Sequence, residues 1–113
     1  VWDIQYLKKL QSWVNHVTVD EKLIHYITAI VQNSRKSKDF MLGASPRAAI
    51  YLLKSARAHA LLEGRDFVIP EDIVEVSLPV LSHRLILSAE RELDGAGMPN
   101  LVKKLVKSVE VPR

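Results

Sequence analysis

Apolar side chains recur along this chain every three or four residues, and the alternation typical of a half-buried strand is nearly absent. Such spacing places the apolar side chains on one face of an α-helix. It predicts one helix over residues 3–15, a second that ends at about Asn33, and a last one over about 99–109. The predicted fold is mainly α, a small bundle of five or six helices with at most two short strand-like segments.

Two features define the start and end of the second helix. Thr18 and Glu21 have the spacing of a capping box, in which the hydroxyl accepts the third helical N–H and the carboxylate reaches back to the Thr18 N–H. Residues 34–39 are polar and charged. We therefore expect a helix that begins just after Thr18 and is followed by a surface loop over 34–39.

The clearest helix start in the chain lies at Ser45. This residue fits the N-cap, Pro46 fits the first helical position, and Arg47 follows. The helix should run to about Glu63, where Gly64 supplies the left-handed residue that ends many helices. Because the segment is rich in alanine, neighbouring helices can approach it closely, and we expect it at the centre of the bundle.

The region after this helix is less regular. Residues 67–69 predict a short extended piece before Pro70 opens a further helix. The first turn contains two acidic side chains, Glu71 and Asp72, which we expect to cap the helix and to suit the positive end of its dipole. Pro79 either interrupts this helix or starts a further turn. Residues 85–87 fit either a short strand or the end of a helix.

Arg47 is the residue whose position points most directly to a ligand. The first turn of a helix is the positive end of its dipole, and unpaired N–H groups point outwards there. Such a terminus attracts anions, and a planar guanidinium added to it can bind two phosphate oxygens at once. The alternative is that Arg47 projects into water or pairs with a nearby carboxylate.

Composition narrows the possible chemistry. The chain has 113 residues, a length typical of one domain, and no cysteine, which excludes disulfides and thiolate metal sites. No secretory signal opens it, so the cytoplasm is the expected location. The four histidines form no close pair of the kind that binds a metal.

The net charge of +3 is mildly basic. Three lysines form a strip on the last predicted helix, Lys103, Lys104 and Lys107. The strip is either a solvated face or the contact surface of a stand-alone basic helical adaptor that binds nucleic acid or a protein. The solvated face is favoured, because no interleaved aromatics and no recognisable reading helix accompany the lysines.

Three motifs resemble the C-terminal lid of MoxR-type AAA+ ATPases. The first is G-A-S-P-R-A at residues 43–48, and the second is L-E-G-R-D-F-V-I-P-E-D at residues 62–72. The third is L-S-H-R at residues 81–84. They follow one another in the order of the family, and the resemblance extends over essentially the whole chain. The first two motifs together make the resemblance specific.

The resemblance implies that residues 1–113 form a single lid domain, excised from a longer protein whose ATPase core precedes Val1. The start with Val1 instead of Met agrees with this expectation. The lid would complete an ATP site, with Arg47 as the second sensor that faces the γ-phosphate. Ser45 and Pro46 would form the helix start that presents it.

The same resemblance implies the properties of the parent protein. Its cofactors would be ATP and Mg²⁺, neither of them bound by the fragment alone. The parent is expected to form a ring, generally a hexamer, and to act as a chaperone that remodels or activates client proteins. Proteins with a von Willebrand factor A domain are among the expected clients. Membrane and nucleic acid are not expected partners.

No catalysis is expected from the fragment itself. Hydrolysis of ATP needs a G-x-x-x-x-G-K-[ST] loop, and none of the four glycines precedes a lysine. His83 and Arg84 fit the family pattern, with packing, inter-subunit contact or loop anchoring as their open roles. Trp2, Tyr6 and Trp13 are expected either in the core or on a surface that touches the ATPase core.

Overall fold

The computed structural model describes residues 4–95 and 97–112. Its helices are α1 (Ile4–Asn15), α2 (Glu21–Lys36), α3 (Pro46–Leu62), α4 (Pro70–Leu81), α5 (Ala89–Leu93) and α6 (Met98–Lys107). Its strands are β1 (Phe40–Leu42) and β2 (Ile86–Leu87). Six helices and one two-stranded sheet in this part of the chain confirm the predicted small helical bundle.

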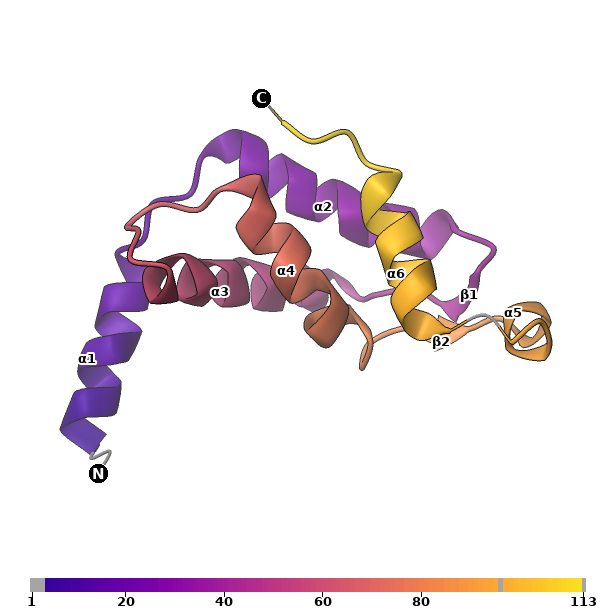
Figure 1. Cartoon of the computed structure of the whole chain (residues 1–113), viewed down its shortest axis with the longest axis horizontal. Coiled ribbons are helices and arrows are strands. Elements are labelled where there is room, and N and C mark those ends of the chain that lie inside the picture. Colours follow the sequence, from indigo (N-terminus) through magenta and orange to yellow (C-terminus); the bar gives the residue numbers. More distant parts are fainter. Residues whose placement is uncertain (1–3, 96, 113) are drawn as a thin grey trace.

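Helix α3 lies at the centre of the molecule and packs against α1, α2 and, most extensively, α4 (Figure 1). Its buried face consists of Ala48, Leu52, Ala56 and Ala60, all with no exposed surface. Three of these four side chains are single methyl groups, so the backbones of the neighbouring helices can come close. The predicted central place of the alanine-rich helix is confirmed, as is Gly64 behind it, with φ of +81°.

Helix α1 is the least buried of the long helices. It projects from one end of the molecule (Figure 1), and none of its side chains is fully buried. Tyr6 is 44% exposed and Trp13 49% exposed. Of the two places expected for these aromatics, the core is therefore wrong, because among the described helices only α3 makes extensive contacts with α1. A surface that touches an ATPase core stays a prediction. Trp2 lies outside the described residues.

The strands β1 and β2 pair antiparallel, with Phe40 opposite Leu87. The segment 85–87, which the sequence left open between a strand and a helix end, thus contributes a strand. Strand β1 was not predicted, because three consecutive apolar residues show no alternation and the pairing partner lies far along the chain.

The start of α2 differs from the prediction. Its N-cap is Asp20, whose carboxylate accepts a hydrogen bond from the Lys22 amide at 2.9 Å. Thr18 forms no capping box with Glu21. Its backbone instead pairs with the predicted extended segment, accepting from the Val68 amide at 2.9 Å and donating to the Asp66 carbonyl at 2.8 Å. The capping box would have paired the Thr18 N–H with the Glu21 carboxylate. In the structure this N–H belongs to a strand-like bridge instead.

The end of α2 also differs, since the helix continues to Lys36 and the predicted surface loop over 34–39 is wrong at both ends. Ser34 has no exposed surface and Asp39 is 6% exposed. Ser34 is covered by the chain that leads into α3, and Asp39 by side chains from α5 and α6. Pro79 does not interrupt α4, which runs on to Leu81.

Candidate functional site

The start of α3 is held against the end of α2 by two close contacts. The buried Ser34 hydroxyl accepts a hydrogen bond from the Ala44 amide at 3.0 Å and donates one to the Val31 carbonyl at 2.6 Å. A Cβ atom at Gly43 would come within 2.6 Å of the Arg35 Cα atom. Glycine is therefore required for the chain to pass this close to α2, and the first turn of α3 is fixed in place.

The first turn of α3 has the predicted form. Ser45 is the N-cap and Pro46 the first helical residue, and the Ser45 side chain makes no capping hydrogen bond. Arg47 is exposed. Among the described residues it makes no hydrogen bond and no ion pair, so the predicted alternative of a carboxylate partner is not observed there. A guanidinium without a partner among the described residues thus lies at the positive end of the central helix.

Arg84 lies against the same helix. Its guanidinium carbon is 4.0 Å from the centroid of the Tyr51 ring, a cation–π contact that joins the segment after α4 to α3. Tyr51 follows Arg47 by one helical turn. The sequence had left packing, inter-subunit contact and loop anchoring open for Arg84, and it gave no indication of Tyr51.

The second motif forms a buried ionic cluster around Asp72. Its carboxylate has no exposed surface and accepts hydrogen bonds from both terminal nitrogens of Arg65, at 2.7 and 2.8 Å. It also pairs with His59 Nδ1 at 2.7 Å and accepts from the Ile69 amide at 2.8 Å. Burial by itself would raise the pKa of Asp72, but these hydrogen bonds outweigh it and lower the pKa to about 2.

The Asp72 cluster confirms the capping role expected for this carboxylate at the start of α4. It also ties the end of α3 to the start of α4, because His59 belongs to α3 and Arg65 to the turn between the helices. These groups are all engaged with one another, so the cluster is a structural feature and not a candidate catalytic site.

The lysine strip on α6 is partly engaged in the fold. Lys104 pairs with Asp39 at 3.2 Å, and Arg91 pairs with the same carboxylate at 2.8 Å. Burial favours the neutral form of Asp39, but these two cations outweigh it and lower its pKa. Lys103 and Lys107 are exposed. Lys104, one of the three lysines, therefore links α6 to the segment before β1 through its ion pair with Asp39.

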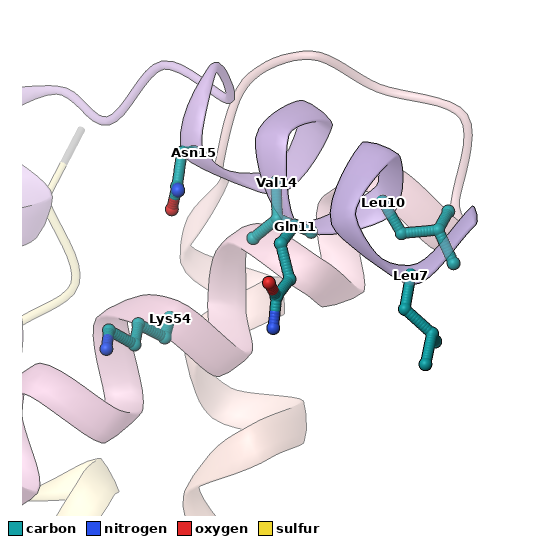
Figure 2. Close-up of a pocket in the computed structure, with 6 residues that line it drawn as sticks. All are labelled: Leu7, Leu10, Gln11, Val14, Asn15 and Lys54. Carbon is teal, nitrogen blue, oxygen red and sulfur yellow. The ribbon is translucent and has the colours of Figure 1, made fainter. Parts of the chain in front are cut away.

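A hollow of about 520 Å³ lies between α1 and α3 (Figure 2). It is lined by Leu7, Leu10, Gln11, Val14, Asn15 and Lys54. Among the described residues that line it, Lys54 alone is charged, and none is a carboxylate, a histidine or a hydroxyl. These six side chains therefore provide no nucleophile and no acid–base pair.

Within residues 4–95 and 97–112, no group of three histidine or acidic side chains is placed to bind a metal ion. None of the helices in this part of the chain combines the length and the apolar character that crossing a bilayer requires.

The order of these elements and their motifs matches known proteins. Residues 32–104 match the family model of the AAA lid domain. A crystal structure of a protein from Cytophaga hutchinsonii, assigned as an ATPase, superimposes with a TM-score of 0.83 at 34% identity. The superposition covers 90% of this chain and 34% of that one.

Relatives of similar sequence include two proteins that align with nearly the whole chain. YeaC of Bacillus subtilis, an uncharacterised protein, is 40% identical over 103 residues, which are 91% of this chain and 32% of YeaC. The chaperone MoxR1 of Mycobacterium tuberculosis is 32% identical over 116 residues, 95% of this chain and 31% of MoxR1.

A third relative aligns over a shorter segment. The protein MoxR of Methylorubrum extorquens is 41% identical over 71 residues, 62% of this chain and 21% of that protein. The chain thus spans about a third or less of the length of these relatives. The match of the family model over most of the chain and the likeness to MoxR proteins agree with the motifs and the fold. This chain belongs to the AAA lid domain family, in the form found at the C-terminus of MoxR-type AAA+ ATPases.

Proposed function

We propose that Arg47 is the second sensor of an ATPase, a lid arginine that faces the γ-phosphate of ATP and couples lid orientation to the state of the nucleotide. The observation that carries this proposal is the exposed guanidinium in the first turn of α3, which has no ion-pair partner among the described residues. A fixed cation beside a terminal phosphate stabilises the negative charge that shifts during phosphoryl transfer. Ser45 and Pro46 would set the helix start from which Arg47 reaches the nucleotide.

The residues at the start of α3 fit a phosphate group. The Ser45 side chain makes no hydrogen bond with the first-turn amides, and the Arg47 guanidinium keeps its donors free of the described residues. The same turn contains no acidic side chain, so Mg²⁺ would be held by the ATPase core and not by the lid. Arg47 is thus half of a site whose other half lies in another domain.

The proposed whole protein consists of this lid, residues 1–113, joined to an ATPase core that precedes it. The core would supply the G-x-x-x-x-G-K-[ST] loop and the acidic strand that positions Mg²⁺. Sequencing the source reading frame upstream of Val1 tests this arrangement. A frame that opens at Val1 without a phosphate-binding loop would contradict it.

The proposed assembly is a ring, generally a hexamer, in the cytoplasm. There the protein would act as a chaperone that remodels or activates client proteins, von Willebrand factor A domain proteins among them. The relative named chaperone MoxR1 supports the class of activity. Helix α3 packs against α2 and α4, so a displacement of Arg47 would move the whole lid. This packing supports the proposed coupling between the state of the nucleotide and the orientation of the lid.

The test of the proposed role is ATP turnover by the intact protein with Arg47→Ala. We expect a loss of about a hundredfold, the usual effect of removing one charge-stabilising donor, with the thermal unfolding of the protein unchanged. Lys103→Ala, which removes another exposed cation from α6, is the matched control and should retain full turnover. Normal turnover by Arg47→Ala would refute the second-sensor role.

A further inference from the structure

The contact between Arg84 and Tyr51 joins a second arginine to helix α3. The Arg84 guanidinium carbon lies 4.0 Å from the centroid of the Tyr51 ring. Tyr51 follows Arg47 by one helical turn, so the two side chains leave the same face of the helix as neighbours. Long side chains in a helix lean towards its N-terminus, so the expected direction of the Tyr51 side chain, and of the guanidinium stacked on it, is towards the turn that carries Arg47.

Arg84 keeps its capacity to bind an anion in this position. The ion pairs among the described residues use His59, Arg65, Arg91 and Lys104, and none of them involves Arg84. Stacking uses the flat face of the guanidinium and leaves the N–H donors at its edge available. Arg84 is half-buried and Tyr51 is 39% exposed, so the pair remains open to solvent.

We infer that Arg84 is a second phosphate-facing cation of the lid, with Tyr51 as the positioning residue that holds it beside Arg47. The inference rests on the proposed function, because it assigns Arg84 to the same nucleotide. A triphosphate carries several negative charges, so two guanidinium groups, Arg47 on α3 and Arg84 stacked on Tyr51 of the same helix, would bind separate oxygens of it. In this role Arg84, the arginine of the L-S-H-R motif, is a phosphate-binding residue.

The competing explanation is that the Arg84–Tyr51 contact only packs the segment after α4 onto α3. The two explanations differ in what the charge of Arg84 does. A packing role affects the thermal stability of the protein and leaves ATP affinity intact. A phosphate-facing role affects ATP affinity, and lysine at the same position restores part of it.

The experiment compares variants of the intact ATPase by their dissociation constants for ATP. Arg84→Gln removes the charge, and we expect its affinity to fall about tenfold, the effect of losing one hydrogen bond to a charged group. Arg84→Lys should recover part of that loss. Tyr51→Phe keeps the ring face and should bind like the wild type, whereas Tyr51→Leu should lose affinity. Lys103→Gln, a loss of one exposed charge on α6, should have no effect.

The Arg47→Ala variant, measured for ATP turnover in the same protein, separates failure of this inference from failure of the proposed function. Unchanged ATP affinity in Arg84→Gln, with turnover lost in Arg47→Ala, would overturn the inference alone. Unchanged ATP affinity in Arg84→Gln and normal turnover in Arg47→Ala would overturn both. A lower melting temperature of Arg84→Gln with wild-type ATP affinity would also overturn the inference, because it indicates a packing role.

Discussion

Asp72 shows how a single residue can make the stability of this lid depend on pH. Its pKa of about 2 in the fold lies below its ordinary value of 3.8. A carboxyl group with a lowered pKa contributes stability above its ordinary pKa, and that contribution is lost as pH falls through the folded value. The difference corresponds to about 2 kcal/mol of the free energy of unfolding.

We therefore expect the chain to lose about 2 kcal/mol of stability through Asp72 as the pH falls from about 4 to about 2. Urea unfolding at a series of pH values measures this loss. Asp72→Asn should be less stable than the wild type at neutral pH, because Arg65 then lacks its charged partner. The variant should also lose less stability on acidification. Parallel pH profiles for the two proteins would contradict the account.

The residues that the sequence identified correctly depend on local structure. Ser45, Pro46 and Gly64 could be predicted because helix capping involves a few consecutive residues. The burial of Ser34 and Asp39 could not, because each is covered by groups far along the chain. The contact of Tyr51 with Arg84 could not be predicted either, because it depends on how the segment after α4 packs against α3.

At the scale of elements, the contact between the end of α2 and the approach to α3 is the feature that positions Arg47. Gly43 allows this approach, because any side chain there would collide with the Arg35 backbone. Helix α3 could be predicted from its capping residues and alanine content. Its anchoring to α2 could not, since the contact joins the approach to α3 to Ser34 and Arg35, which the sequence predicts in a surface loop.

Gly43→Ala tests this anchoring. The added methyl group meets the Arg35 Cα atom at 2.6 Å, so the backbone must shift, and we expect a loss of about 1–3 kcal/mol in the free energy of unfolding. Gly97→Ala is the matched control, because the nearest atom to its Cβ lies at 3.6 Å, an ordinary contact. Denaturant unfolding measures both variants, and equal stability of the two would show that the close approach is not required.

At the scale of the whole molecule, the lid is a packed body with projecting ends. Its radius of gyration is 15.3 Å, against about 13 Å for a compact domain of this length. Helix α1 and the short α5 project at opposite ends of the molecule (Figure 1). The helical class could be predicted from apolar spacing, and α1, α2, α3, α4 and α6 from spacing and capping residues, but α5 and the extended position of α1 could not. An apolar stripe predicts burial without showing which surface covers it.

In the proposed whole protein, Arg47 faces the terminal phosphate of ATP. A structure of the intact ATPase with a non-hydrolysable ATP analogue and Mg²⁺ would test this role without relying on kinetics. We expect a guanidinium nitrogen of Arg47 at about 2.7–2.9 Å from a γ-phosphate oxygen, the usual length of a charge-assisted hydrogen bond. An Arg47 side chain directed into solvent, with another residue on the γ-phosphate, would refute the proposed role.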